Sequence, residues 1–334
     1  MKQYRLALLG FGNVGRALAR LLVAKTAELR ERYLVEWEIT GVATRRLGWR
    51  ASDQAIDVAD IDEVPRENGF AEWLAKARPD VLFETTSLNP ETGQPAIDYL
   101  KASLQAGVHT ITANKGPIVY AYDELKTIAD ANGKRFFFEA TVLDSAPVFS
   151  LFRETLPGVK VRGFSGVFNS TTNVILETME AGRSFAEGVK TAQELGVAET
   201  DPTHDVEGWD SIMKICAIAR VILGAPLKPS DVRREGIRGL DTQTLQAARA
   251  EGKPYKLLSR AIINPDGSIA ATVRPEQIAP GDPFSSVRGT SLAVHFELDT
   301  IPGLTIVSHR PNLQSTAYGL LADFINITRI DKAR

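Results

Sequence analysis

The sequence predicts an α/β protein, in which a doubly wound parallel sheet is joined to a second, α+β domain. Three observations support this prediction. Short apolar strands alternate with amphipathic helices over the first 140 or so residues. A glycine-rich turn follows the first strand at once, and the strict alternation stops near Ala140. The βαβα order is typical of a parallel sheet with helices on both faces, whereas separate runs of helices and strands are typical of an α+β domain.

The first strand, Tyr4–Leu9, leads directly into a G-x-G-x-x-G turn and a helix. The first glycine permits the tight turn, the second lets a pyrophosphate approach the backbone, and the third lets the helix pack on the strand. The helix N-terminus then faces the phosphates. The pattern in this setting predicts a Rossmann-type dinucleotide site, and the alternative is a glycine-rich turn without a ligand. The predicted cofactor contacts here are Gly10, Phe11, Gly12, Asn13, Val14 and Gly15.

The second strand, Glu36–Ala43, ends in Thr44-Arg45-Arg46 without an acidic residue. An acid at this position commonly binds the ribose 2′-hydroxyl of NAD, whereas arginine can pair with the 2′-phosphate of NADP. Arg45 and Arg46 therefore favour NADP, with NAD also possible. Two exposed surface arginines are the alternative.

Two further strands end in polar residues at positions that suit the ligand crevice of a doubly wound sheet. Asp80–Glu84 is followed by Thr85-Thr86-Ser87, and Val108–Thr112 by Ala113-Asn114-Lys115. We expect Thr86, Ser87 and Lys115 to contact the cofactor. A solvated loop lysine is the alternative for Lys115.

The second half predicts helices over 172–179 and 185–195, then strands over 255–263, 268–274 and 291–298. We assign residues 1–140 and 305–334 to the dinucleotide-binding domain, and residues 141–304 to the second domain. The helices of the second domain leave one sheet face available, either for solvent or for a second copy.

The most unusual stretch lies between Ala192 and Lys214, where acids cluster ahead of one lysine. Its polar part carries Pro202 and reads as a loop, and a buried helix begins near Gly208. Asp210 and Lys214 share a helix face because they are four residues apart. A solvated acidic loop with one weak ion pair is one interpretation. The other is a site whose carboxylates bind an ammonium group and whose desolvated lysine transfers a proton.

The composition excludes several functional classes. Of the 334 residues, 44% are hydrophobic and 24% are charged, which is typical of a soluble globular protein. The net charge of −2 indicates no nucleic-acid partner, and no apolar run is long enough for a membrane span. The single Cys216 excludes an intrachain disulfide, and we expect a cytoplasmic protein.

The segment from Ala192 to Lys214 resembles the homoserine dehydrogenase signature, A-x3-G, an acid, then D-P-x2-D-x2-G-x-D-x3-K. Its fixed positions are Ala192, Gly196, Asp201, Pro202, Asp205, Gly208, Asp210 and Lys214. The glycine-rich turn, residues 112–115, 139–142 and 166–173 extend the resemblance over nearly the whole chain. It implies a short form without a C-terminal regulatory domain, and a homodimeric enzyme of threonine and methionine biosynthesis.

The resemblance implies NAD(P)-dependent interconversion of L-homoserine and L-aspartate 4-semialdehyde. Glu199 and Asp210 would hold the substrate, Lys214 would donate the proton, and Lys115 would lie near nicotinamide and substrate. Asp205 would belong to the same polar site. Charge that develops on the aldehyde oxygen suits a nearby ammonium group.

The sequence departs from the family pattern at three places. Leu143-Asp144-Ser145-Ala146 replaces a glycine-rich run whose carbonyls bind a monovalent cation, Ser170 replaces a glycine, and residues 312–316 replace a second glycine-rich stretch. The expected Na⁺ or K⁺ ligands are Glu139, Val142, Asp144 and Ala146. Two other functions stay open: a dehydrogenase of another small amino or hydroxy acid, and a non-catalytic NAD(P)-binding sensor.

Overall fold

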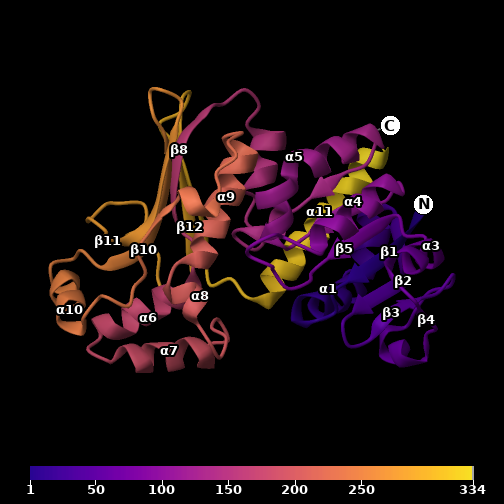
Figure 1. The fold of residues 1–334 in the computed structure, drawn as a ribbon, viewed down its shortest axis with the longest axis horizontal. Helices are drawn as coiled ribbons and strands as arrows, with labels where there is room; N and C mark the ends of the chain where they lie inside the picture. The colour runs from indigo at the N-terminus through magenta and orange to yellow at the C-terminus, as the bar shows by residue number, and fades with distance from the viewer. Residues whose placement is uncertain (333–334) are drawn as a thin grey trace. The chain divides into compact units, whose positions relative to one another are not determined.

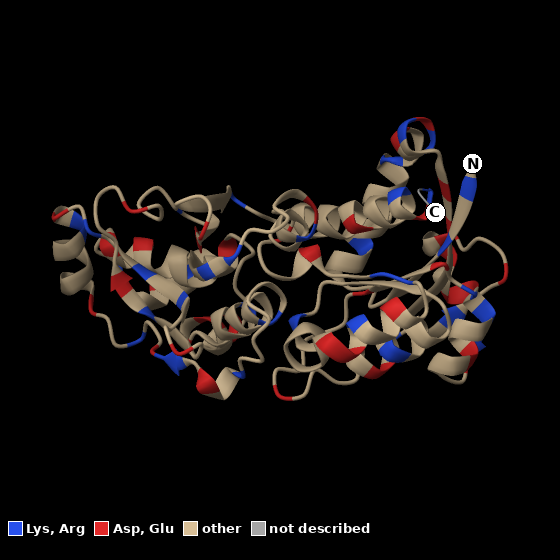
Figure 2. Cartoon of the chain, turned by 90° about the horizontal axis from the view of Figure 1, so that it is seen from above, with Lys and Arg blue, Asp and Glu red and all other residues tan. Residues whose placement is uncertain are grey.

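The computed structural model describes residues 1–332, which divide into two compact units. The first comprises Met1–Ser145 and the C-terminal segment that starts at Leu313, and the second comprises Ala146–Asn312. The division falls later in the chain than the boundaries at residues 140 and 305 that the sequence suggested. Within residues 1–332, no helix is long and apolar enough to cross a membrane. Basic and acidic residues are interspersed along the chain in each unit (Figure 2).

The first unit is built on a seven-stranded sheet of order β4-β3-β2-β1-β5-β6-β7 (Figure 1). The strands β2, β1, β5, β6 and β7 run parallel, which confirms the doubly wound α/β prediction. β3 and β4 form an antiparallel edge that the sequence analysis missed. The bounds are β1 Lys2–Leu9, β2 Val35–Thr44, β3 Gly48–Ala51, β4 Arg66–Glu67, β5 Val81–Glu84, β6 His109–Thr112 and β7 Phe136–Phe137.

Six α-helices belong to this unit: α1 Asn13–Ala24, α2 Thr26–Tyr33, α3 Phe70–Ala77, α4 Ala96–Gln105, α5 Lys115–Ala131 and α11 Leu313–Lys332. The first helix and the last pack against each other, although they come from opposite ends of the chain (Figure 1). Their shared core is apolar and aromatic. The rings of Tyr4 and Phe324 are 5.5 Å apart, edge to face, a geometry that adds to simple area burial.

The second unit contains a six-stranded sheet of order β13-β12-β8-β10-β11-β9. Its main strands pair antiparallel, as the α+β interpretation expected. The bounds are β8 Val161–Val167, β9 Arg233–Arg234, β10 Tyr255–Ile263, β11 Ile269–Gln277, β12 Leu292–Leu298 and β13 Gly303–Ser308. Residues 305–334 were predicted to belong to the other domain, but β13 pairs with β12 and so belongs here.

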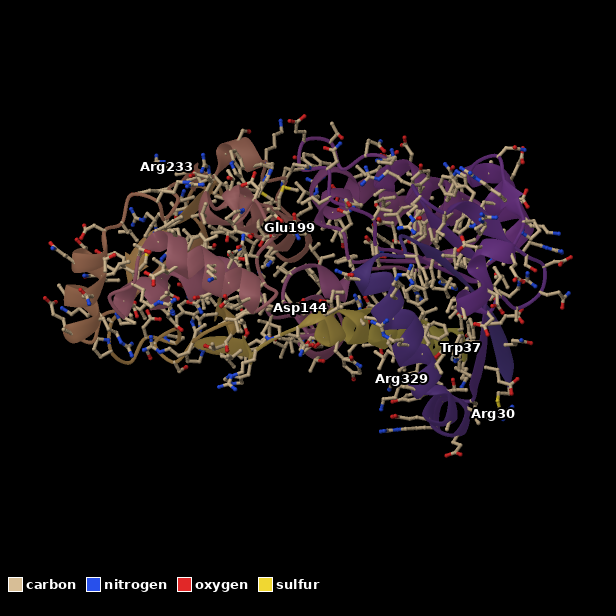
Figure 3. All side chains as sticks on the ribbon, turned by 90° about the horizontal axis from the view of Figure 1, so that it is seen from below. Arg30, Trp37, Asp144, Glu199, Arg233 and Arg329 are labelled. Atoms are coloured by element: carbon tan, nitrogen blue, oxygen red, sulfur yellow. The ribbon has the colours of Figure 1, made fainter. Side chains whose placement is uncertain are left out.

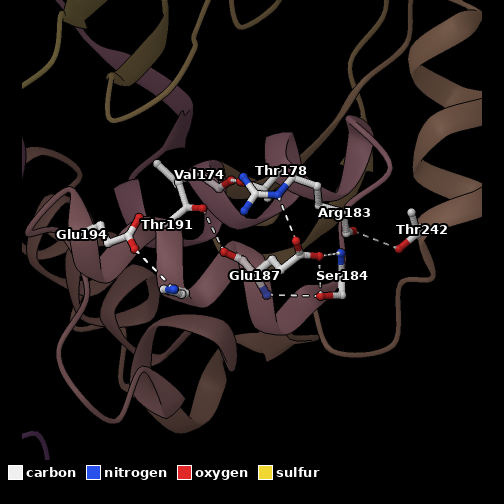
Figure 4. A network of polar contacts seen from close by, with 9 residues as sticks. Val174, Thr178, Arg183, Ser184, Glu187, Thr191, Glu194 and Thr242 are labelled. Atoms are coloured by element: carbon white, nitrogen blue, oxygen red, sulfur yellow. Dashed lines mark hydrogen bonds and ion pairs between the residues drawn. The ribbon is translucent and has the colours of Figure 1, made fainter.

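The helices of the second unit are α6 Ser170–Glu180, α7 Phe185–Glu194, α8 Thr203–Val206, α9 Trp209–Ile222 and α10 Thr242–Ala250. A capping box fixes the start of α7. The Glu187 backbone N–H donates to the Ser184 hydroxyl, and the Ser184 N–H donates to the Glu187 carboxylate (Figure 4). Two orphan donors of the helix end are thereby satisfied. The body of α7 packs against α6.

β7 ends at Phe137, and Glu139 begins a short 3-10 turn, Glu139–Thr141. One local expectation was wrong. The polar stretch before Gly208 is not all loop, since α8 forms one helical turn within it. Gly208 then takes a positive φ of 82° between α8 and α9, a conformation that favours glycine.

Candidate active site

The glycine-rich turn of the first unit has the geometry that a pyrophosphate site needs. Gly10 has a φ of 97°, and a Cβ there would lie 2.6 Å from the carbonyl carbon of Thr85. A Cβ on Gly15 would clash with the carbonyl oxygen of Gly10. At Gly12, by contrast, an added Cβ would meet nothing within 4 Å. The outer glycines are therefore required by packing, whereas the middle one borders open space, as approach of a phosphate requires.

The other residues predicted in this turn divide by exposure. Phe11 is buried, and the guanidinium of Arg16 lies 4.8 Å from its ring centroid. Asn13 is exposed at the first position of α1, and Val14 is half-buried. The Phe11 side chain therefore serves the core, and only its backbone could face a ligand.

Arg45 and Arg46 lie in the turn that joins β2 to β3, and both side chains are exposed. The turn is held by the Leu47 backbone N–H, which donates to the Thr44 hydroxyl at 2.9 Å. Gly48 follows with a φ of 74°, and the guanidinium of Arg66 packs directly over it. Arg66, which the sequence analysis overlooked, therefore adds a third positive charge beside the arginine turn.

Thr86, Ser87 and Lys115 occupy the carboxyl edge of the same sheet. Thr86 and Ser87 follow β5, and Lys115 opens α5 directly after β6. The edge is tied together by Glu84, which the sequence analysis noted only as a strand end. A charged residue inside the apolar run Val81-Leu82-Phe83-Glu84 was the available signal, because such residues are almost never fully buried unless paired.

In the second unit, three of the predicted substrate residues come together. The ammonium of Lys214 lies 3.0 Å from Oδ2 of Asp210 and donates to the carbonyl oxygen of Phe168 at 2.6 Å. The side-chain amide of Asn169 donates to Asp205 Oδ1 at 2.7 Å and to Asp210 Oδ2 at 3.1 Å. Asn169 thus bridges two carboxylates while its own oxygen accepts from the Thr172 N–H at the start of α6. No sequence pattern indicated this role for Asn169.

Burial and the neighbouring charge of Asp210 raise the pKa of the Asp205 carboxyl. Hydrogen bonds from Asn169 and Thr171 and the charge of Lys214 oppose this rise. The site therefore concentrates negative charge in a partly desolvated place, where a cationic group of a ligand would be bound strongly.

Other acids of the segment are separate from this cluster. Glu207 pairs instead with Arg234 at 3.1 Å and Arg238 at 2.9 Å. Asp201 accepts from the backbone and hydroxyl of Thr203, which lowers the pKa of its carboxyl. Glu199 is exposed on the loop between α7 and α8 (Figure 3), and its backbone carbonyl accepts from Gln193. Within residues 1–332 no residue hydrogen-bonds the Glu199 carboxylate, in contrast to the carboxylates of Asp201 and Glu207.

The loop in which a monovalent cation was expected is tied to the last helix of the first unit. Asp144 has a φ of 58°, its carbonyl oxygen abuts Gly319 of α11, and its carboxylate accepts from Thr316 at 2.6 Å. Glu139 and Val142 are buried in the same unit, whereas Ala146 belongs to the other unit. These contacts show Asp144 bound to α11. Residues 1–332 also contain no cluster of three or more His, Cys, Asp or Glu that could hold a metal ion.

Known proteins resemble both units of this chain, the one with the glycine-rich turn and the one with Asp205, Asp210 and Lys214. The homoserine dehydrogenase family model matches residues 147–325, and the model of the homoserine dehydrogenase NAD-binding domain matches residues 10–139. The NAD(+)-dependent homoserine dehydrogenase of Pseudomonas canavaninivorans is 35% identical, over 98% of this chain and 97% of its own. Homoserine dehydrogenase of Methanocaldococcus jannaschii is 33% identical, over 96% and 97%.

Solved structures agree with the sequence relatives. A putative homoserine dehydrogenase of Archaeoglobus fulgidus superimposes with a TM-score of 0.86 at 29% identity, over 97% of this chain and 99% of its own. One from Thiobacillus denitrificans gives 0.85 at 27% identity, over 100% and 75%. With both halves matched by family models and relatives above 30% identity along almost the whole chain, the protein belongs to the homoserine dehydrogenase family, oxidoreductases that act on a CH–OH group.

Proposed function

We propose that this homoserine dehydrogenase uses the cluster of Asp205, Asp210 and Lys214, bridged by Asn169, as its substrate site. The reaction interconverts L-homoserine and L-aspartate 4-semialdehyde. The main support for this proposal is that the Lys214 ammonium is held between Asp210 and the Phe168 carbonyl. A lysine fixed by two acceptors, with a side chain only 12% exposed, keeps its position while a substrate binds.

The residue roles follow from charge. When bound, the nicotinamide delivers or accepts the hydride. Lys214 stabilises the charge that develops on the aldehyde oxygen and donates a proton to it, and in the oxidation direction it accepts that proton. The exposed Glu199 carboxylate and Asp210 bind the substrate ammonium, and Asp205 adds to the negative potential there. We assign Lys115, at the N-terminus of α5, to the cofactor side of the reaction.

For the cofactor we propose NADP as the preferred form. Arg45 and Arg46 are exposed at the carboxyl end of β2, and neither has an ion-pair partner within residues 1–332. Both are therefore available to a 2′-phosphate. NAD remains the specific alternative, because a 35% identical relative is named for its dependence on NAD(+). Na⁺ or K⁺ stays an expectation from the family resemblance, and none of these residue roles depends on it.

We further propose a cytoplasmic homodimer that works in threonine and methionine biosynthesis. Support for the dimer comes from β10, which lies inside its sheet, between β8 and β11. Ile262 and Ile263 at its end are nevertheless 41% and 36% exposed. Apolar residues in that position would be covered by a second copy. Light scattering coupled to size exclusion tests this: a monomer at micromolar concentration would contradict it.

A spectrophotometric assay at 340 nm with L-homoserine and each cofactor tests the proposed function. Reduction of NADP or NAD that depends on homoserine is the expected result. Turnover only with another small amino or hydroxy acid would support a different dehydrogenase. Cofactor binding without turnover of any of these substrates would support a sensor instead.

A further inference from the structure

Glu84 is a fully buried carboxylate at the last position of β5. One of its oxygens accepts from both the backbone N–H and the hydroxyl of Thr86, with the N–H at 2.7 Å. The other accepts from the hydroxyl of Thr112, at the end of β6, at 2.5 Å. No ion pair within residues 1–332 includes Glu84. Burying a carboxylate without a cation is unfavourable, so its hydrogen bonds must offset the cost.

The contacts of Glu84 extend in two directions along the carboxyl edge of the sheet. On one side, Thr86 follows Thr85, whose hydroxyl donates to the carbonyl oxygen of Gly10 at 2.9 Å. This side therefore ends at the glycine-rich turn.

On the other side, the Thr112 hydroxyl accepts from the Asn114 N–H at 2.9 Å. The Asn114 side chain caps α5 by accepting from the Gly116 N–H at 3.0 Å. This side therefore ends at the helix start that carries Lys115. A chain of hydrogen bonds thus joins three loops that follow β1, β5 and β6, and Glu84 is its centre.

We propose that Glu84 is a positioning residue for the nucleotide site, whose carboxylate fixes the Thr86–Ser87 loop relative to the start of α5. Both carboxylate oxygens are needed, because each accepts from a different loop. The proposal rests on the proposed function in one respect, that this edge binds the nicotinamide nucleotide. Glu84 itself has no exposed surface and acts through Thr86 and Thr112.

Glu84→Gln tests the proposal, because it keeps the shape and replaces one acceptor oxygen with a donor. Asp80→Asn is the matched control: Asp80 precedes the same strand at its amino end, where it accepts from the Arg5 N–H at 2.9 Å. We expect Glu84→Gln to raise the Kd of NADPH and NADH about tenfold or more, as loss of a charge-assisted hydrogen bond does. Asp80→Asn should leave both Kd values within twofold.

Calorimetric titration of the full chain, without substrate, measures Kd, and the melting temperature is recorded for each variant. A purely structural role would lower the melting temperature of Glu84→Gln and leave the Kd of the folded protein within twofold. That result would overturn the proposal. The titration contains no homoserine, so its result does not depend on turnover. In the separate assay at 340 nm, wild-type protein that binds nucleotide but does not oxidise homoserine would contradict the proposed function alone.

If Glu84→Gln yields no folded protein, Thr112→Val cuts the same link from the other loop while keeping the side-chain shape. The expected result is again a Kd for NADPH and NADH raised about tenfold. Folded Thr112→Val with wild-type Kd values would show that the link between the loops is not needed for nucleotide binding.

Discussion

The ammonium of Lys214 lies 3.0 Å from the carboxylate of Asp210, one helical turn earlier in α9. The spacing of four residues places them together, as the sequence indicated. The structure adds the second acceptor, the carbonyl oxygen of Phe168, the residue directly after β8. The lysine is thus fixed by two separate elements, which distinguishes it from an ordinary surface pair.

Lys214→Ala should lower kcat by about 10²–10⁴-fold, because a general acid is lost. The Kd of the nucleotide should stay nearly unchanged. Lys190→Ala is the control, since Lys190 forms an i,i+4 pair with Glu194 on α7 but is 75% exposed. Steady-state kinetics and nucleotide titration check both variants. A Lys214→Ala enzyme within threefold of wild-type kcat would rule out the assigned role.

Glu199→Gln should raise the KM for L-homoserine, with a smaller effect on kcat. A charge-assisted contact to the substrate ammonium is worth about 1.5–3 kcal/mol, equivalent to a tenfold or greater change. Glu194→Gln, an exposed acid at the end of α7, is the matched control. If both variants show the same KM as wild type, the ammonium is bound elsewhere.

Asp205→Asn should raise the melting temperature at pH 8 and lower kcat/KM. Burial and the charge of Asp210 raise the folded-state pKa of Asp205, so the folded protein holds this proton more tightly than the unfolded chain. Stability from this group is present below the unfolded pKa, about 3.9, and is lost as pH rises through the folded pKa. Asparagine removes that loss and can still accept from Asn169. The gain in melting temperature should therefore shrink as the pH falls from 8 to 4.5, and an equal gain at both pH values would contradict the assignment.

Local patterns explain why much of the fold could be predicted. The first strand, the glycine turn and α1 follow from a short apolar run, fixed glycines and a helical period, all within neighbouring residues. The β3–β4 edge was missed because β4 has two residues and β3 has four, too short for an alternating pattern. β13 was misassigned because its membership depends on pairing with β12, which sequence periodicity does not encode.

The residues of the candidate site also differ in whether the sequence could reveal them. Asp210 and Lys214 could be found because their relation is local to one helix. The roles of Asn169 and Glu84 could not be predicted, because their partners come from distant segments: Asp205 lies 36 residues beyond Asn169, and Thr112 lies 28 beyond Glu84. A buried polar residue is visible in sequence, but its hydrogen-bond partner is set by tertiary structure.

His109→Asn should make the protein less sensitive to acid. Burial lowers the pKa of His109 to about 4, with the charges of Lys134, Lys2 and Arg135 acting in the same direction and Asp331 in the opposite one. The folded state therefore binds this proton less readily than the unfolded chain. Stability from the neutral imidazole is present above pH 6.5 and is lost as pH falls towards 4.

Protonation of His109 lowers the free energy of unfolding by at most about 1.4 kcal/mol per pH unit. The Arg135 N–H donates to His109 Nδ1 at 3.0 Å, and the side-chain oxygen of an asparagine can still accept this hydrogen bond. Denaturant unfolding at pH 7, 6 and 5 should give a shallower decline for the variant. His204→Asn, at an exposed position, should decline as wild type does. Parallel declines for wild type and His109→Asn would refute this assignment.

Replacing Arg45 and Arg46 together with alanine should weaken NADP far more than NAD. The two side chains are exposed at the β2–β3 turn, and the turn itself is held by Thr44 and Leu47, so the fold should persist. Losing one charge-assisted contact of about 1.5–3 kcal/mol should reduce the preference for NADP over NAD by roughly tenfold or more. Replacing Arg30 and Arg32 together with alanine is the control, because both are exposed arginines of α2 in the same unit.

Measuring Kd and kcat with each cofactor separates two cases. If NADP is the working cofactor, the double variant loses both affinity and turnover with NADP. If NADP is instead a tightly bound dead-end ligand, wild type binds NADP well but turns over only with NAD, and the double variant is relieved of inhibition by NADP. Unchanged NADP affinity in the double variant would mean that neither arginine contacts the 2′-phosphate.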